Sequence, residues 1–275
     1  MSFKNTFLLV LVLFLFGTVG LYFYNSNHLR NLTEEQSKTL ENVQIDIKST
    51  PIAVGMGMGT DWFETWANEN DIIVFFGEDF SKIPEPDIGK VGWNTPSFNK
   101  VIETENQWQG KLDAILYDYE MWDKTSQEEK NDPDWAVKRA QNFANERNML
   151  LIQGSSWKMV TERDRSGETF FGIIKVETLQ SIARNVDNYG FNAVGLRKES
   201  PQDYIKWFIQ CSNYAREVNP NIKMWFMLDA RNQTADEMYD MFLEVNKDVE
   251  ISGISIMGTR QDQKTVEELI SKLRS

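Results

Sequence analysis

Short apolar runs alternate with amphipathic stretches from Pro51 to the end of the chain. The runs are continuous and β-prone, which is typical of strands buried on both faces in a parallel sheet. Strands are therefore predicted at Ile52–Met56, Ile72–Phe76, Leu112–Asp118, Met149–Gln153, Asn192–Arg197, Lys223–Leu228 and Ile251–Met257. A further short strand is predicted at Lys90–Trp93, within an irregular connection that contains several prolines.

Helical patterns occupy most of the intervals between these strands. Helices are predicted at Trp62–Asn68, Ser97–Gln109, Pro133–Arg147, Val176–Asn188, Pro201–Val218, Thr234–Asn246 and Thr265–Leu273. Strands that alternate with helices indicate a parallel sheet covered by helices, and the length after residue 50 approaches the ~250 residues typical of a (β/α)8 barrel. The predicted fold class is therefore α/β, a TIM barrel with one strand irregular or missing. An open, doubly wound sheet is the alternative.

The beginning of the chain follows a different pattern. Phe7–Tyr24 is almost wholly apolar and is preceded by Lys4. As a helix it would span roughly 27 Å, close to the thickness of a bilayer core, and its last aromatic residues suit a membrane interface. We expect residues 1–24 to be an uncleaved transmembrane anchor in the cell membrane, with the rest of the chain outside the cytoplasm. The alternative, a cleaved signal peptide, would give a secreted protein.

A polar segment separates this anchor from the predicted barrel. Residues 25–50 contain Glu34, Glu35, Lys38 and Glu41 and are predicted to form a stalk. The folded domain is expected to occupy residues 51–275.

Charge and residue counts narrow the chemistry of this domain. The formal net charge of -12 argues against nucleic-acid binding, because phosphate contacts depend on clustered Lys and Arg. The single cysteine, Cys211, excludes an internal disulfide and a cysteine metal cage. The single histidine, His28, lies in the stalk, which excludes histidine triads and histidine zinc sites from the domain. Acid–base chemistry would depend on carboxylates, Tyr or Lys, and neither a cofactor nor a metal ion is expected.

Polar and aromatic residues collect where the predicted strands end, which is where a parallel barrel carries its functional residues. The stretch from Leu112 to Trp122 is the most acidic of these strand ends. Leu116, Asp118 and Glu120 are spaced two residues apart, so they share one face of the strand. The remaining candidates for substrate binding are Trp62, Glu78, Trp122, Trp157, Arg197, Asp229 and Arg231.

Asp118 and Glu120 are the candidate catalytic residues. Two acids on one face repel each other, which raises the pKa of one of them. A neutral Glu120 beside an ionised Asp118 would be a general acid at neutral pH. The structural alternative is that both acids form ion pairs with Arg197 or Arg231.

One motif resembles that of a known family. Asp113-Ala-Ile-Leu-Tyr-Asp-Tyr-Glu120 resembles the D-G-x-D-x-D-x-E signature of family-18 glycoside hydrolases, which are chitinase-like barrels. Leu116 replaces the middle aspartate of that signature. The resemblance implies that Glu120 protonates the glycosidic oxygen and that Asp118 helps to activate the substrate. The same stretch is also similar to the Y-D-x-E-x-W motif of uncharacterised exported barrel proteins.

The function predicted from the sequence is that of a membrane-anchored, extracytoplasmic glycoside hydrolase. Its partner would be a carbohydrate or cell-envelope glycan. The 9 Trp, 8 Tyr and 17 Phe suit stacking on sugars and equally suit a core of large side chains. Two alternatives stay open at this point: a non-catalytic barrel that binds carbohydrate or envelope, and a cell-surface scaffold without a small ligand.

Overall fold

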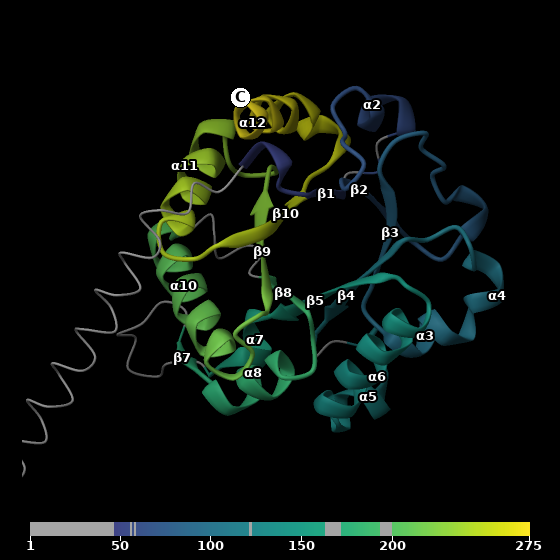
Figure 1. The fold of residues 1–275 in the computed structure, drawn as a ribbon, viewed down its shortest axis with the longest axis vertical. Helices are drawn as coiled ribbons and strands as arrows, with labels where there is room; N and C mark the ends of the chain where they lie inside the picture. The colour runs from purple at the N-terminus through teal and green to yellow at the C-terminus, as the bar shows by residue number, and fades with distance from the viewer. Residues whose placement is uncertain (1–46, 56, 58, 121–122, 163–171, 193–199) are drawn as a thin grey trace, which may run out of the picture. The chain divides into compact units, whose positions relative to one another are not determined.

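Eight parallel strands form one closed barrel in the computed structural model, which describes residues 47–55, 57, 59–120, 123–162, 172–192 and 200–275 (Figure 1). The strands are β1 (Ile52–Gly55), β2 (Ile72–Phe76), β3 (Lys90–Thr95), β4 (Ala114–Tyr119), β5 (Leu150–Ser156), β8 (Asn188–Asn192), β9 (Lys223–Asp229) and β10 (Ile251–Met257). Because β1 pairs with both β2 and β10, the sheet has no open edge there. The predicted barrel is confirmed, and the open sheet is excluded.

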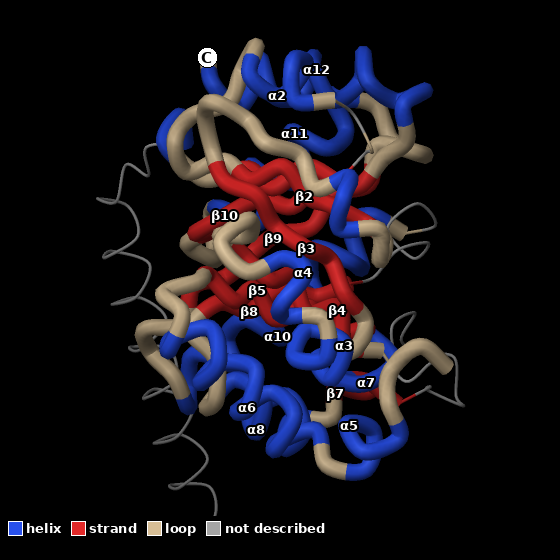
Figure 2. The backbone as a smooth tube through the Cα atoms, turned by 90° about the vertical axis from the view of Figure 1, so that its right-hand side faces the viewer, coloured by secondary structure: helices blue, strands red, loops and turns tan. Residues whose placement is uncertain are grey.

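Helices surround the barrel (Figures 1 and 2). They are α2 (Thr60–Glu64), α3 (Phe98–Glu103), α4 (Glu105–Trp108), α5 (Gln127–Asn131), α6 (Pro133–Glu146), α7 (Trp157–Val160), α8 (Val176–Ala183), α10 (Pro201–Val218), α11 (Ala235–Asn246) and α12 (Gln263–Arg274). Short 3-10 turns occur at η1 (Ile47–Ser49), η2 (Phe80–Lys82) and η3 (Arg260–Asp262). A separate antiparallel pair consists of β6 (Thr161–Glu162) and β7 (Ile173–Ile174).

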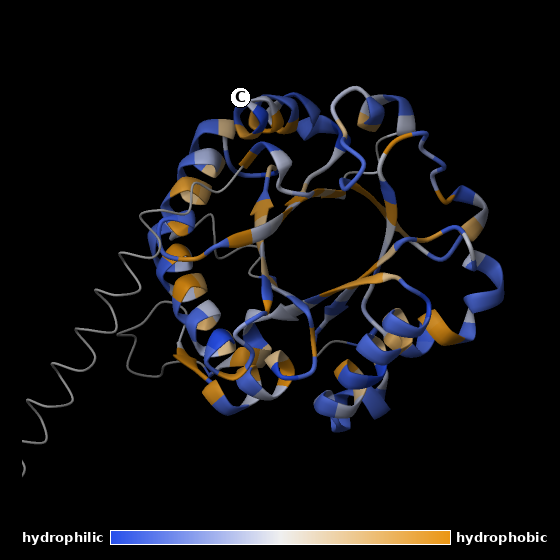
Figure 3. Cartoon of the chain, viewed as in Figure 1, coloured by the Kyte–Doolittle hydropathy of each residue, from blue (hydrophilic) through white to orange (hydrophobic). Residues whose placement is uncertain are grey.

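The alternation of side chains along each strand divides the apolar residues into two layers. Outward-facing residues such as Ile115, Tyr117 and Tyr119 are fully buried between the strands and the helices. Figure 3 shows the apolar colour on the strands and on parts of the helices around them. A smaller cluster fills the inside of the barrel and consists of Ala53, Ile72, Val74, Ala114, Ile152 and Trp225.

Trp225 closes the middle of the barrel. Its Nε1 donates a hydrogen bond to Asn188 Oδ1 over 3.3 Å, and the side chain is buried. A Cβ on Gly253 would lie 2.5 Å from the Trp225 ring, a distance that no real Cβ contact shows, so glycine is required at that position. The interior below the barrel mouth is therefore packed, as expected for a barrel of this size.

A buried ion pair holds the last helix at the opposite end of the barrel. Arg274 of α12 donates to both carboxylate oxygens of Asp71, over 2.6 and 2.8 Å. Asp71 is fully buried and also accepts hydrogen bonds from the backbone N–H groups of Ile52 and Asn68. This carboxylate therefore links the entry to β1, the turn before β2 and the carboxyl end of the chain.

Several predicted elements have the observed bounds, including Ile72–Phe76, Pro201–Val218 and Ile251–Met257. The short strand at Lys90 is also confirmed and extends to Thr95. The helix predicted over Ser97–Gln109 is instead two short helices that divide at Thr104. The sequence patterns do not predict α5, α7, β6 and β7.

The sixth strand of the barrel is the main difference from the prediction. The helix expected to reach Asn188 ends at Ala183, and Asn188–Asn192 is a strand. Its polar and glycine positions resemble a turn in sequence, but Tyr189 and Phe191 are buried in the outer layer, whereas Gly190 lies against Trp225. The predicted strand Asn192–Arg197 thus begins where the observed strand ends, and its other residues lie outside the described ranges.

The predicted anchor and most of the predicted stalk also lie outside the described residues. Among the residues that the structure describes, no helix combines the length and apolar character needed to cross a membrane. Residues 46–275 form one compact unit.

Candidate functional site

Strand β4 carries the predicted catalytic residues to the mouth of the barrel. Ala114 and Leu116 face the interior cluster, and Asp118 follows them on the same face. Glu120 comes directly after the strand and is half-buried. The shared face of Leu116 and Asp118 is therefore confirmed, with the apolar residue below and the acid at the rim.

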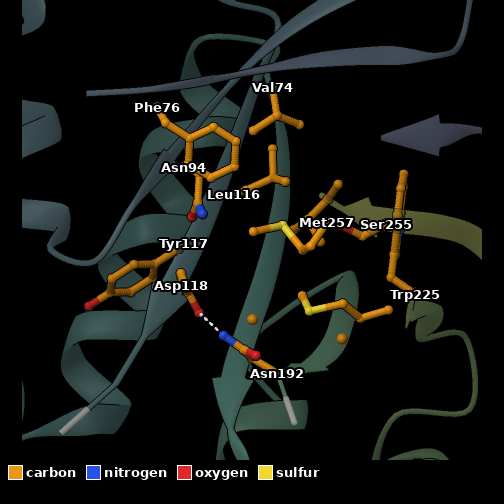
Figure 4. A pocket seen from close by; sticks show the side chains of 14 residues that line it. Val74, Phe76, Asn94, Leu116, Tyr117, Asp118, Asn192, Trp225, Ser255 and Met257 are labelled. Atoms are coloured by element: carbon orange, nitrogen blue, oxygen red, sulfur yellow. Dashed lines mark hydrogen bonds between the residues drawn. The ribbon is translucent and has the colours of Figure 1, made fainter. Parts of the chain in front are cut away.

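Asn192 joins the two acids. Its Nδ2 donates to Asp118 Oδ1 over 3.1 Å and to Glu120 Oε1 over 3.0 Å. Asn192 ends β8, and β5 lies between β8 and β4. In β5, Gly154 is the residue in register with Asp118, and because it has no side chain it leaves the path between Asn192 and Asp118 open. Figure 4 shows the Asn192 amide pointing at the Asp118 carboxylate.

The environment raises the pKa of both carboxyl groups. Burial raises the pKa of Asp118, and hydrogen bonds from Asn192 and Asn94 oppose that shift because they stabilise the ionised form. Burial also raises the pKa of Glu120, the negative charge of Asp118 raises it further, and the charge of Lys158 opposes both effects. The amide donors therefore favour the ionised form of Asp118, and the charge of Asp118 favours the protonated form of Glu120.

Two pockets meet at Asp118. The inner pocket lies inside the barrel and is lined by Val74, Phe76, Asn94, Leu116, Tyr117, Asp118, Ile152, Gly154, Gly190, Asn192, Trp225, Met227, Ser255 and Met257 (Figure 4). The outer pocket is lined by Phe76, Gly77, Glu78, Trp93, Asn94, Thr95, Pro96, Lys100, Asp118 and Lys124. Phe76, Asn94 and Asp118 belong to both, so the acid stands at their junction.

The other residues predicted to bind substrate occupy different places. Glu78 lines the outer pocket, where Lys100 forms an ion pair with it. Asp229 ends β9 and is buried in a two-bond ion pair with Arg231, over 2.7 and 2.6 Å. Arg231 is therefore engaged by Asp229, in contrast to the predicted alternative in which it pairs with Asp118 or Glu120.

The predicted tryptophans lie apart from the two pockets or outside the described residues. Trp62 donates its indole N–H to Glu267 of α12 over 2.6 Å and packs edge-on against Trp66. Trp157 begins α7, is half-buried and packs against the outer core. Trp122, together with Arg197, lies outside the described residues.

Four further residues complete the site and were not predicted from the sequence. Asn94 and Asn192 hydrogen bond to Asp118, and Lys100 and Lys124 line the outer pocket. The place of Asn94 could have been predicted from the sequence. It follows Gly92 by two residues, so both lie on the inner face of β3. Among the described residues, no group of three or more His, Cys, Asp and Glu side chains lies close enough to hold a metal ion.

No protein-family model and no curated protein matches this chain. One similar solved structure comes from a study of the mechanism of the Schiff base forming fructose-1,6-bisphosphate aldolase. It is 11% identical over 87% of this chain and 97% of its own, with a TM-score of 0.43. Another, from a structural study in Aquifex aeolicus VF5, is 9% identical over 87% of this chain and 94% of its own, with a TM-score of 0.45. The likeness concerns the barrel, which the strand pairing already establishes.

The predicted glycoside hydrolase activity is wrong. No protein-family model matches the chain, so none supports the resemblance on which this prediction rests. The arrangement of the motif gives a physical reason. Asp113 precedes β4 at the end away from the mouth, where it accepts a hydrogen bond from the Val91 N–H over 2.9 Å. With Leu116 in the apolar interior, the resemblance to the family-18 signature is reduced to Asp118 and Glu120.

Proposed function

We propose that this barrel is an acid–base enzyme that removes a proton from a carbon next to a carbonyl group in a small molecule. Asp118 is the base and Glu120 is the acid. The observation that carries the proposal is the amide of Asn192, which donates to both carboxyl groups and so holds Glu120 beside Asp118, the acid at the junction of the two pockets. A pair of acids with unequal environments is a common source of an acid and a base at one site.

In the proposed step, Asp118 takes one proton from the substrate and Glu120 gives one proton to it. The C–H bond of the substrate breaks, and its proton goes to the Asp118 carboxylate. The electron pair of that bond forms a carbon–carbon double bond, and the carbonyl oxygen takes the proton of Glu120, which gives an enol. The reverse step returns a proton to the same or a neighbouring carbon, so the chemistry suits an isomerase or a lyase.

Two features of the surroundings support this assignment. Asn94 and Asn192 stabilise the ionised form of Asp118, which keeps it available as a base. The charge of Asp118 raises the pKa of Glu120, which keeps a proton available for the oxygen. The two amides therefore favour the base form of Asp118, and the charge of Asp118 favours the acid form of Glu120.

Exchange of carbon-bound hydrogen with solvent deuterium tests the proposal. The protein would be incubated in D2O with a panel of 2-oxo acids, hydroxyketones and simple ketones, and exchange would be followed by proton NMR. We expect exchange in at least one compound and a loss of at least about 100-fold in D118N and in E120Q, because acid–base groups contribute roughly 10²–10⁴-fold. The matched control D248N changes an exposed acid and should retain the wild-type rate.

Exchange that is as fast in E120Q and D118N as in the wild type would contradict the proposal. The absence of exchange in every compound of the panel would also contradict it. Circular dichroism of each variant would show that the barrel is intact.

A further inference from the structure

Phe76 lies at the mouth of the barrel, beside the acid of the proposed reaction. It ends β2 and is in register with Asn94 of β3, so both side chains lie on the inner face. Together with Asn94 and Asp118, it lines both the inner and the outer pocket (Figure 4). The residue is 41% exposed, although the rest of β2 is buried. An apolar ring is therefore presented to a molecule that enters either pocket.

A glycine on the neighbouring strand gives this ring its place. A Cβ on Gly55, the last residue of β1, would lie 2.5 and 2.6 Å from two atoms at the far end of the Phe76 ring. It would also lie 3.5 Å from Sδ of Met257, which lines the inner pocket. The ring thus fills the space that a side chain at residue 55 would occupy, and it reaches from β2 across to β1. A larger residue in place of Gly55 would displace the ring.

The inner pocket beside this ring is mostly apolar. Its walls include Val74, Leu116, Ile152 and Trp225. The cavity volume open to water-sized molecules is about 40 Å³ there. Since one water needs roughly 10–15 Å³ of such volume, the pocket has room for a group of about three carbon atoms. A charged group would lose its hydration among these side chains, so a short alkyl group fits best.

The charges around the two pockets favour an uncharged molecule. The charged residues of the outer pocket are two acids, Glu78 and Asp118, and two lysines, Lys100 and Lys124, so their charges cancel. Among the described residues that line the inner pocket, Asp118 is the one carboxylate and none is a lysine or an arginine. An anion there would meet the charge of Asp118 without a compensating cation, and a cation there would occupy the base in an ion pair.

We infer that Phe76 determines the specificity of the site, because its ring packs on a short alkyl group of an uncharged ketone and directs that group into the inner pocket. The inference rests on the proposed proton transfer, which places the reacting carbon beside Asp118. Contact with the ring and with the apolar walls removes the alkyl group from water, and this burial favours binding. The substrate class is therefore a neutral ketone with an alkyl group of about three carbons next to the reacting carbon.

Three matched ketones test this inference on the full chain, with dissociation constants measured by saturation-transfer NMR. The first, 4-methylpentan-2-one, carries an isopropyl group next to the reacting carbon. Acetone lacks that group, and freshly prepared 3-oxobutanoate has a carboxylate of similar size in its place. We expect the first to bind at least about tenfold more tightly than each of the others. Equal affinity for acetone would overturn the alkyl group, and equal affinity for 3-oxobutanoate would overturn the uncharged character.

Variants of the ring locate the effect. F76A should weaken binding of 4-methylpentan-2-one at least about fivefold, with acetone unchanged, whereas F76L keeps an apolar side chain and should retain most of the affinity. G55A leaves Phe76 in place in the sequence but displaces its ring, so it should also reduce the preference for the alkyl group. The matched control I88A removes another exposed apolar side chain and should change none of the affinities.

A variant of the pocket keeps the test decisive if F76A fails to fold. L116F fills the inner pocket from β4 and should abolish the preference for 4-methylpentan-2-one over acetone. A preference that is unchanged in F76A would overturn the role of Phe76. A preference that survives L116F would place the alkyl group outside the inner pocket and would also overturn the inference.

The binding series and the deuterium-exchange assay can fail independently. If the alkyl ketone binds best but its hydrogens do not exchange, the specificity stands and the proton transfer fails. If exchange occurs at the same rate with and without the alkyl group and the ring, the proton transfer stands and the role of Phe76 is wrong.

Discussion

Asn192 determines how the two acids of the site behave. A single amide nitrogen donates to both carboxyl groups, and it crosses a strand that has glycine at the intervening position. Hydrogen bonds to an ionised carboxylate lower its pKa, so Asn192 opposes the effect of burial on Asp118. Because the same amide also donates to Glu120, Asn192 connects the two carboxyl groups, and its removal affects both of them.

Removal of this amide should raise the pKa of Asp118 further. In N192L we expect the Asp118 carboxyl group to titrate at a higher pH than in the wild type, because a hydrogen bond that stabilises its ionised form is lost. Carbon-13 NMR of labelled aspartate carboxyl groups would follow the titration. The exposed substitution N131L, at the end of α5, is the control and should leave the titration unchanged. An unshifted Asp118 in N192L would show that its amide contact is not significant.

The same pKa shift predicts a pH-dependent stability. Because the pKa of Asp118 is raised in the folded state, its contribution to stability is complete below the unfolded value of about 3.9 and is lost as pH rises through the folded value. D118N removes this loss. The free energy of unfolding of D118N minus that of the wild type should therefore increase from pH 4 to pH 7, as measured by urea unfolding. A difference that is constant or decreases over this range would contradict the assigned direction.

At the scale of elements, the strands of the barrel place the acids and the last helix closes the opposite end. Asp71 has backbone donors from two segments and the guanidinium of Arg274 on its two oxygens. Since Asp71 is fully buried, its charge depends on these partners. The carboxyl-terminal turn of α12 is therefore part of the barrel's stability.

Loss of the guanidinium should destabilise the fold without changing the mouth. We expect R274M to lower the free energy of unfolding by about 3–5 kcal/mol, because a buried carboxylate would lose its ion-pair partner. The control K264M, on the exposed side of the same helix, should change it by less than about 0.5 kcal/mol. The double variant D71N/R274M should recover part of the loss; a double variant that is no more stable than R274M would mean that the unpaired charge is not the cause.

At the scale of the whole molecule, the barrel follows from the alternation of buried strands and helices, and this pattern was sufficient to predict it. The sixth strand is misplaced in the prediction because its inner face consists of Asn188, Gly190 and Asn192, which resemble a turn in sequence. In the structure Asn188 and Gly190 contact Trp225, and Asn192 binds the two acids. The acids Asp118 and Glu120 were predictable from their spacing at a strand end. Asn192 was not, because it approaches Asp118 from a strand 74 residues further along the chain.

The resemblance of the central motif to a glycosidase signature illustrates the limit of a short match. Spacing alone cannot distinguish Asp113, at the entry to β4, from the acids at its exit, although the strand separates them by its whole length. Only the two acids at the exit, Asp118 and Glu120, lie at the candidate site. The Asn192 amide that donates to both of them supports the proposed proton transfer instead.

The compact unit of residues 46–275 predicts that this part of the chain folds on its own. A fragment beginning at Asp46 should give the same melting temperature and circular dichroism as the barrel of the full chain. The predicted anchor implies that the full chain, but not this fragment, sediments with membranes after cell lysis. Equal partitioning of the two would contradict the anchor and leave the barrel unaffected.

The central claim is that Glu120 holds a proton while Asp118 is ionised beside it, and infrared titration of the protein tests this most directly. We predict a protonated carboxyl band that is absent in E120Q and that persists above the ordinary glutamate pKa of about 4.3. In D118N, without the neighbouring charge, this band should disappear at a lower pH than in the wild type. A Glu120 band that disappears near pH 4.3 in the wild type, or at the same pH in D118N, would contradict the account.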